Sequence, residues 1–320
     1  MPQVFNPEKV MLRDSLGTDI INAGFTQAFL QSLASTSKVI QLGQRVDMGN
    51  QKITRVSNGA GELSDAYFVQ EGQKIGVANI KGSDYTLESH KIGVILPVTE
   101  EFLTYTWSQY FSEVLPLITD KFNKMIDGAA FLGLHGNVFG SNVLAAATTA
   151  GNVVSGNITA TNIIDLEAMT TTQPNAFVGN RVLERDLLRL NAVPTGNGLV
   201  ETVAYNRPAT PTGVGLLDGL PYTHLQLVNT ETYPEGTLIT GNFNSLKYGI
   251  PNTAQLKLYI SKEGTLSKVQ NTNPDTGDVN LFEQDMQALR ATFEIAVAVP
   301  NGSDFAVITK GEDEEDPAGV

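Results

Sequence analysis

The chain contains no cysteine among its 320 residues. Without thiols it cannot form disulfides, use a thiolate nucleophile, or hold zinc or an iron–sulfur cluster through sulfur. Stability must therefore come from packing and from association with other chains. Several classes of enzyme are excluded by this absence alone.

Long apolar runs are also missing. No stretch of about 18 consecutive apolar residues occurs, and the opening MPQVFNPEKV lacks the basic-then-apolar order of a secretory signal. We therefore expect a soluble, non-exported protein with no membrane partner. A hydrophobic content of 41% is nevertheless enough to build a substantial core.

Basic residues are few, since 21 Lys and Arg stand against 34 Asp and Glu, for a net charge of -13. Five of the acids form the run EDEED at 312–316, so residues 310–320 are predicted to be an acidic disordered tail. The remaining body is still acidic. Broad electrostatic affinity for nucleic acid or anionic membranes is therefore not expected, although such a body can lie beside DNA.

Catalytic and ligand-binding motifs are scarce. His90, His135 and His224 are far apart, and none has a paired ligand spacing such as H-x-x-x-H. The sequence GVGLLDG at 213–219 has the wrong spacing for a nucleotide loop and predicts a turn. The run NPDTGD at 273–278 lacks the spacing of a calcium loop and predicts a hairpin turn. We predict no catalytic residue, no metal and no cofactor.

The sequence KIGVILPVTEEFL joins an expected strand to an expected helix. The apolar run at 92–96 predicts a strand buried on both faces, which Pro97 ends. Thr99 is suited to cap the helix, and Glu100 and Glu101 place negative charge in its first turn. Helix capping therefore explains this carboxylate pair better than acid–base catalysis does.

A single long helix is predicted over residues 99–131, with a kink at Pro116. At 1.5 Å per residue it would be about 50 Å long, which is typical of a spine lying across a sheet. The apolar positions recur at steps of three or four, at Leu103, Trp107, Phe111, Val114, Ile118, Phe122, Met125 and Ala129.

Residues 49–91 alternate polar and apolar side chains between glycine-rich turns, which predicts a long hairpin. A two-stranded hairpin buries no core of its own and is marginal alone in water. We therefore expect another subunit to support it.

The rest of the chain mixes short helices with strands, so the expected fold class is α+β. Helices are predicted near 161–169 and 180–190, and strands at 175–178, 238–240, 247–250, 256–260, 288–299 and 305–308.

Charged residues provide the candidate contact sites. Arg181, Arg185 and Arg189 form a basic stripe at steps of four. Contact with DNA is one interpretation, but a solvated face or a salt bridge to a neighbouring acidic subunit is favoured. The full set of predicted inter-subunit contacts is Arg55, Glu71, Lys74, Arg181, Arg185 and Arg189.

Several longer stretches resemble the major capsid proteins of tailed bacteriophages, in particular siphophages infecting Gram-positive bacteria. These stretches are PQVFNPEKVM, FVQEGQKI, KIGVILPVTEEFL, YTWSQYFSEVLPLI, LDGLP, LITGNFNSLKYGIP and NLFEQDMQALRATFEIAVAV. The resemblance runs from about residue 2 to residue 309, in the same order throughout.

The resemblance implies the Johnson fold, which is that of the Hong Kong ninety-seven phage capsid. In that fold the extended loop lies over the adjacent subunit, and axial domains meet around the axes of capsomers. The implied division is an N-terminal arm (1–40), an extended E-loop (49–91), a peripheral domain (92–139) with the spine helix at 99–131, an axial domain (140–255), and the return strands of the peripheral domain with a final axial strand (256–309).

The implied function is self-assembly into an icosahedral shell of hexamers and pentamers around double-stranded DNA, without enzymatic activity. The implied partners are other copies, a portal, a separate scaffolding protein and packaged DNA held by weak non-specific proximity. There is no room for a scaffolding segment before the arm, so either the scaffold is separate or the chain begins at a processed end. No position matches the lysine–asparagine crosslink of some relatives.

The implied location is the virion, after assembly in the host cytoplasm. The alternatives are an encapsulin-like nanocompartment that loads cargo and, more remotely, an α+β hydrolase.

Overall fold

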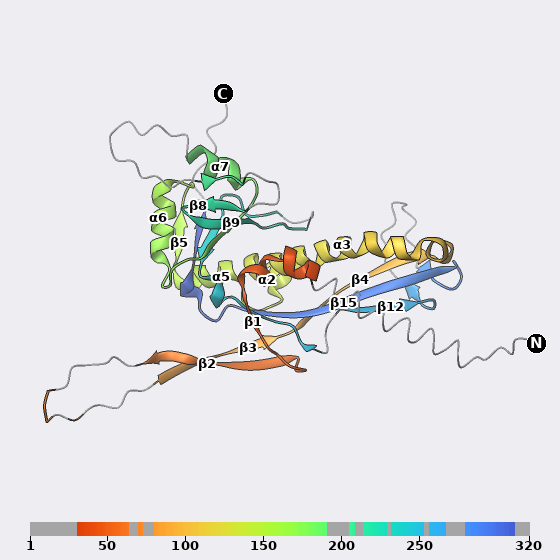
Figure 1. Ribbon diagram of the computed structural model, residues 1–320, viewed down its shortest axis with the longest axis horizontal. Helices are drawn as coiled ribbons and strands as arrows, with labels where there is room; N and C mark the ends of the chain where they lie inside the picture. Colours follow the sequence, from red (N-terminus) through yellow and green to blue (C-terminus); the bar gives the residue numbers. More distant parts are fainter. Residues whose placement is uncertain are drawn as a thin grey trace, which may run out of the picture.

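The computed structural model describes residues 31–63, 70–72, 74, 80–190, 205–208, 214–228, 232–252, 256–266 and 279–310. Figure 1 shows an elongated molecule in which a long helix crosses a sheet at one end, a mixed unit of helices and strands lies at the other, and a hairpin projects below. The observed class is α+β, as predicted.

One half of the molecule is organised by its longest strand, β15 (Met286–Ala298). It runs antiparallel to β4 (His90–Thr99) along one edge, and to β12 (Lys257–Ser261) and β11 (Lys247–Gly249) along the other. β1 (Gln44–Val46) joins parallel to β11, which completes a five-stranded sheet. Because β11 lies in this sheet, the chain returns to it before residue 255.

Strand β15 alternates between a core face and an outer face. Phe293, Ile295 and Val297 are buried in the core cluster that also contains residues of the long helix. Arg290, on the outer face, is exposed. The alternation follows the two-residue period of a pleated strand, so the helix can cover only one side of this sheet.

The prediction for the strand before the long helix was wrong on two counts. β4 continues through Pro97 to Thr99, and its burial alternates, with Ile95 48% exposed. Pro97 is tolerated because β4 is an edge strand of the sheet and pairs with β15 on one side. The outer face is open because the helix packs against the other face only.

The long helix α3 runs over Glu100–Leu132, within one residue of the prediction at each end. Ile118, Phe122 and Ala129 are buried as expected, whereas positions 103, 107 and 111 are described for the backbone alone. The helix continues through Pro116. Thr99 occupies the N-cap position, but its hydroxyl makes no capping hydrogen bond.

A seven-stranded sheet forms the other half, in the order β5, β16, β10, β6, β9, β8, β7. Its strands are β5 (Val153–Ser155), β6 (Ala176–Gly179), β7 (Tyr205–Asn206), β8 (Gly215–Leu217), β9 (Leu220–His224), β10 (Leu238–Gly241) and β16 (Phe305–Thr309). The associated helices are α4 (Leu134–Asn137), α5 (Val143–Ala150), α6 (Ala160–Met169) and α7 (Leu183–Leu190), with short turns of 3-10 helix at η1 (Phe243–Ser245) and η3 (Gly302–Asp304).

Several elements of this half were not predicted, namely α4, α5, β5, β7, β8 and β9. Helix α5 has the alanine-rich sequence VLAAATTA, in which apolar periodicity is hard to recognise. The stretch GVGLLDG supplies strand β8 as well as the predicted turn, because Asp218 and Gly219 both have positive φ, at 48° and 79°. Two such residues form the tight connection of a β-hairpin.

The two halves share one hydrophobic core. Phe131 of α3 lies 5.8 Å from Phe243, and Phe243 lies 5.5 Å from Phe305 at the start of β16, measured between ring centroids. The same cluster includes Phe293 of β15. The long helix is therefore packed against both sheets.

A close backbone contact at Gly241 gives a test of this packing. A Cβ added there would lie 2.4 Å from the carbonyl oxygen of Asp304 and 2.7 Å from a ring carbon of Phe305. We expect Gly241→Ala to lower the free energy of unfolding by about 3 kcal/mol. Gly93→Ala is the control, because its nearest neighbour is the Thr292 methyl group at 3.3 Å, and we expect a change below about 1 kcal/mol. Equal denaturation midpoints for the two variants would contradict the assignment.

The last part of the predicted arm belongs to this core. Residues 31–36 are helical, and α2 covers Lys38–Leu42. Leu33 and Val39 are fully buried in the shared cluster. Residues 1–30 lie outside the described residues.

The predicted hairpin is formed by β2 (Ile53–Leu63) and β3 (Ile80–Glu88), which pair antiparallel from Ile53 opposite Glu88. Its base packs on β15, where Leu87 joins Met48, Ala296 and Ala298 in a small buried cluster. Beyond this base the hairpin projects away from both sheets (Figure 1). The described residues between the two strands, 70–72 and 74, are exposed.

A second small hairpin pairs β13 (Thr265–Leu266) with β14 (Val279–Asn280). The calcium-like run at 273–278, predicted to be its turn, lies outside the described residues.

Candidate functional site

A buried carboxylate joins the long helix to the N-terminal part of the chain. Asp127 of α3 is only 4% exposed and accepts hydrogen bonds from the Ser37 hydroxyl (2.8 Å), the Lys38 backbone N–H (2.9 Å) and the Val39 backbone N–H (3.1 Å). Burial raises the pKa of Asp127 to about 6, although these donors and the Lys38 charge oppose the shift. The carboxylate thus closes the first turn of α2, whose N–H groups have no partner within that helix.

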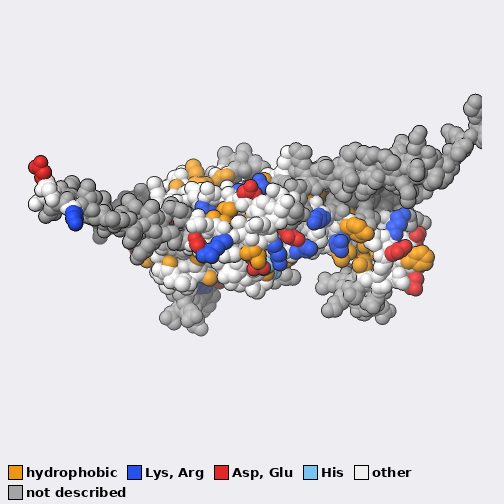
Figure 2. All heavy atoms as spheres, turned by 90° about the horizontal axis from the view of Figure 1, so that it is seen from below, with side chains coloured by type: hydrophobic (Ala, Val, Ile, Leu, Met, Phe, Trp, Pro, Cys, Tyr) orange, Lys and Arg blue, Asp and Glu red, His pale blue; other side chains and the backbone are white. Residues whose placement is uncertain are grey.

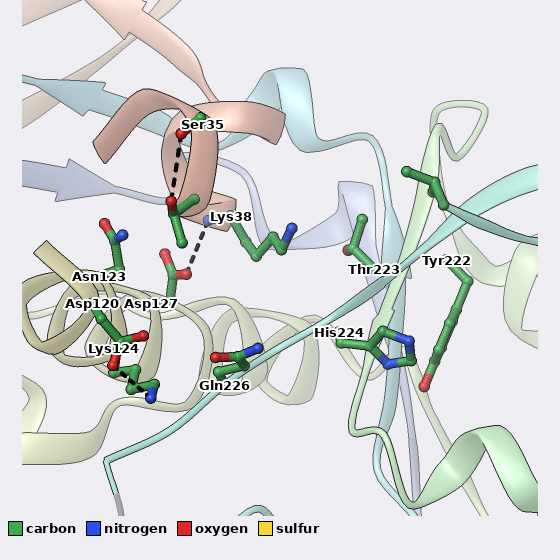
Figure 3. Close-up of a pocket in the computed structure, with 12 residues that line it drawn as sticks. Ser35, Lys38, Asp120, Asn123, Lys124, Asp127, Tyr222, Thr223, His224 and Gln226 are labelled. Carbon is green, nitrogen blue, oxygen red and sulfur yellow. Dashed lines mark hydrogen bonds and ion pairs between the residues drawn. The ribbon is translucent and has the colours of Figure 1, made fainter. Parts of the chain in front are cut away.

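Beside Asp127 lies a polar cavity of about 240 Å³ between α3, α2 and strand β9. Figure 3 shows Lys38 and Gln226 pointing into it from opposite elements. Lys124 forms an ion pair with Asp120 at 2.7 Å, and burial lowers the pKa of Lys38. The charged groups that line the cavity are therefore largely balanced by one another.

Two buried polar groups line this cavity without a hydrogen-bond partner among the described residues. They are the side-chain amide of Asn123, on both its nitrogen and its oxygen, and Nδ1 of His224. A polar cavity with such groups is suited to ordered water. The described hydroxyls that line it donate to backbone carbonyl groups instead of to a base, so these residues show no nucleophile–base pair. Ser35 and Thr36 bond to the Ser32 carbonyl, Thr223 to that of Phe177, and Tyr222 to that of Asn180.

A second buried carboxylate connects several elements at the β7 end of the seven-stranded sheet. Glu184 of α7 is 8% exposed, accepts a hydrogen bond from the Tyr205 hydroxyl (3.2 Å) and forms an ion pair with Arg207 Nε (3.1 Å). His224 Nε2 lies 3.9 Å away, and burial lowers the pKa of His224 despite the Glu184 charge. This cluster links α7 to β7 and β9, which is a structural role.

The predicted arginine stripe is exposed, and two of its members have a partner on their own helix. Asp186 lies 3.4 Å from Arg185 and 3.5 Å from Arg189, while Arg181 precedes α7. The internal acid reduces the net positive charge of the stripe. Contact with a neighbouring subunit stays a prediction for these three residues.

The predicted hairpin contacts lie on the opposite side of the molecule from α7 (Figure 1). Arg55 forms a 2.6 Å ion pair with Asp84 across the hairpin, and the pKa of Asp84 is lowered by a hydrogen bond from Ser57 and then by Arg55. Glu71 and Lys74 are exposed between the strands. The six predicted contact residues therefore lie in two separate regions, three in the hairpin and three in or beside α7.

One surface was missed by sequence reasoning. Ile95 of β4 and Tyr259 of β12, exposed by 48% and 59%, both pair with Arg290 of β15, whose guanidinium lies 5.3 Å from the Tyr259 ring centre. They form an open sheet face with apolar character, and such exposed patches are typical of interaction sites. The available signal was an arginine in the middle of a mainly apolar strand.

The described ranges offer neither a metal-binding cluster nor a membrane-spanning helix. They contain no group of three or more His, Cys, Asp or Glu side chains placed to hold a metal ion. None of their helices combines the length and apolar character required to cross a bilayer.

A long helix across a sheet, a projecting hairpin and open apolar faces define a structural protein that associates through extended surfaces. The family model for the phage capsid family matches residues 17–310. The chain is also 38% identical to the major capsid protein of Staphylococcus phage 80alpha, over 98% of this chain and 92% of that protein. The chain belongs to the phage capsid family, and it is a phage major capsid protein, hence a component of the virion.

Solved structures show the same fold. A chain from Microbacterium phage Oxtober96 superposes with a TM-score of 0.65 at 20% identity, covering 86% of this chain and 91% of that one. A chain from the capsid of an empty GTA particle, computed with C5 symmetry, has a TM-score of 0.59 at 12% identity, covering 86% and 90%. Both confirm the predicted capsid fold.

Proposed function

We propose that copies of this chain assemble as hexamers and pentamers into a closed icosahedral shell around double-stranded DNA. The observation that carries the proposal is the β2–β3 hairpin, which is anchored to β15 at its base and projects away from the body (Figure 1). A two-stranded hairpin needs a further surface for stability, and a neighbouring copy supplies one. The C5 symmetry with which the related GTA capsid was computed supports the pentamers.

The same assembly gives each segment of the chain a proposed role in the shell. Residues 49–91 are proposed as the E-loop that lies over the adjacent subunit, and residues 1–40 as an arm whose end is fixed in the core. The peripheral domain comprises residues 92–139 with the return strands of 256–309, and the axial domain comprises residues 140–255 with the final strand. Strand β11 is the exception, since it lies in the five-stranded sheet with β15.

The net charge bears on how the shell meets packaged DNA. A chain with a net charge of -13 repels the phosphate backbone, so packaged DNA lies against the shell through weak and non-specific proximity. We infer a separate scaffolding protein and a portal, with assembly in the host cytoplasm before the shell becomes part of the virion.

The direct test is electron microscopy of the purified protein, expressed alone and with the neighbouring candidate scaffold gene. We expect closed shells of uniform diameter with fivefold vertices. A protein that stays monomeric under both conditions and at high concentration would refute the proposal. A gene placed beside terminase, portal and tail genes, instead of a cargo enzyme, separates a capsid from an encapsulin-like compartment.

The proposed hairpin contact also predicts the effect of Arg55→Ala. The Arg55–Asp84 pair is exposed, so its loss should leave the melting temperature of the unassembled subunit nearly unchanged. The yield of shells should nevertheless fall, because the substitution removes a charge from the contacting strand. Lys52→Ala, which breaks the 3.8 Å pair with Glu88 nearer the base, is the matched control. Equal shell yields for both variants and the unmodified protein would exclude Arg55 from the interface.

A further inference from the structure

A single phenylalanine stands out from the end of the five-stranded sheet. Phe282 is 81% exposed, the largest value among the large hydrophobic residues of the described ranges. It lies in the turn that enters β15, next to Leu281, which is only 2% exposed. Single exposed apolar side chains are common on protein surfaces, so a binding role for Phe282 depends on its surroundings.

The turn holds Phe282 in a fixed position. Its backbone N–H donates to Asn280 Oδ1 at 3.2 Å, and the Met286 N–H donates to the Leu281 carbonyl at 2.9 Å. The Leu281 N–H donates in turn to the Gly264 carbonyl at 2.9 Å. These bonds fix the backbone of the turn, and a fixed backbone loses little conformational entropy on binding, which favours Phe282 as an anchor.

Acidic residues flank this phenylalanine. Glu283 and Asp285 are both exposed in the same turn. Figure 2 shows hydrophobic side chains next to acidic ones at the end of the molecule where β15 begins. A matching surface should therefore combine an apolar hole with a basic rim.

Such a surface exists on the same chain. A cavity of about 150 Å³ opens between α2, β1 and β11, and an apolar cavity of about this size can hold a benzene ring. Its apolar lining consists of Leu33, Ala34, Ile40, Tyr248, Ile250 and Pro251. Arg45 also lines it, is exposed, and makes no ion pair within the described residues.

Phe282 cannot reach this cavity within its own chain. Tyr248 of the cavity pairs with Val297 near the end of β15, whereas Phe282 precedes Met286 at its start. Eleven residues of strand separate Met286 from Val297, which corresponds to about 36 Å. A contact between the two surfaces must join different copies, and a head-to-tail contact of this kind propagates into rings or lattices.

We propose that Phe282 of one subunit inserts into the cavity lined by Ala34 and Tyr248 of another subunit, with Glu283 facing Arg45. The proposal rests on the shell assembly proposed above and specifies one of its contacts. The complementary charges set the register of the contact, and the buried ring supplies most of its strength.

Crosslinking tests the contact directly, because the chain has no cysteine of its own. Differently tagged Glu283→Cys and Ala34→Cys proteins are mixed, assembled and treated with a short bismaleimide. A mixed dimer is expected. Thr148→Cys, exposed on α5, replaces Glu283→Cys in the control and should give none. The absence of mixed dimers, or an equal yield of mixed dimers from the Thr148→Cys control, would overturn the proposal.

Assembly assays supply the second test. Phe282→Ala should raise the protein concentration needed for shells by about tenfold or more, while the melting temperature of the unassembled subunit stays unchanged. Arg45→Glu and Glu283→Arg should each impair assembly, and the double variant should restore it. Normal assembly of Phe282→Ala would refute this contact alone, whereas the absence of shells from the unmodified protein would refute the proposed function itself.

Discussion

Replacing residues 58–83 with the dipeptide Asn-Gly is expected to leave a folded subunit that forms no shells. The variant keeps Val56, Tyr85 and Leu87, which pack the base of the hairpin near β15. It also joins Ser57 to Asp84, which already face each other across the two strands, through a turn suited to a hairpin. The variant lacks the part of the hairpin that is proposed to contact a neighbouring copy.

The measurement combines size-exclusion chromatography and electron microscopy with thermal unfolding of the unassembled subunit. We expect a monomer peak and a melting temperature close to that of the unmodified subunit. The control keeps the full hairpin but carries Glu71→Ala and Lys74→Ala, which separates the length of the hairpin from its charge. Shells of normal yield from the shortened variant would remove the main support for the proposed assembly.

Replacing Asp127 with alanine is expected to lower the free energy of unfolding of the subunit by about 2–4 kcal/mol. The carboxylate is buried and accepts three hydrogen bonds from Ser37, Lys38 and Val39. Its removal leaves these donors without an acceptor at the junction between α2 and α3. Urea denaturation measures the effect through the transition midpoint.

Asp120→Ala is the matched control, because Asp120 lies on the same helix and pairs with Lys124 in a partly exposed position. Its loss should cost less than about 1 kcal/mol. If both variants unfold at the same urea concentration, Asp127 does not anchor the N-terminal part of the chain.

The buried Asp127 carboxylate predicts that the stability of the subunit depends on pH. Its pKa is raised from 3.8 in the unfolded chain to about 6 in the folded one, so the folded state binds the proton more tightly. The stability contributed by protonation is full below about pH 4 and is lost as the pH rises through about 6. The quantity to measure is the difference in free energy of unfolding between the unmodified subunit and Asp127→Asn. This difference should fall by up to about 3 kcal/mol as the pH rises through this window, and it should stay level at higher pH. A difference that rises with pH would contradict the assignment.

Elements with a strong local pattern were predicted closely. The apolar stripe of α3 located that helix within one residue at each end, because side chains three and four apart lie on one face whatever packs against them. Alternation located the strands β2, β3 and β15 in the same way. For β4 the apolar run predicted a strand but not which of its side chains are buried. The burial of these side chains depends on which face of the sheet helix α3 covers.

Contacts between distant residues could not be predicted. Asp127 meets Ser37 across 90 positions of sequence, and no periodicity links the two. The cavity proposed to receive Phe282 is lined by two segments that lie far apart in the sequence, 33–45 and 248–252. For the predicted contact residues, the sequence located the charges, but only the structure placed Asp84 against Arg55 and Asp186 between Arg185 and Arg189.

By itself the sequence determined the α+β class, the long helix, the unsupported hairpin and, through its longer motifs, the capsid family. These properties depend on neighbouring positions along the chain, where the pitch of a helix or the pleat of a strand sets which side chains share a face. The tertiary structure alone decided which face of the five-stranded sheet stays open, which carboxylates are buried, and that Phe282 and its matching cavity lie at opposite ends of β15. Those properties arise from packing between segments far apart in the chain, where small differences in geometry decide which groups meet.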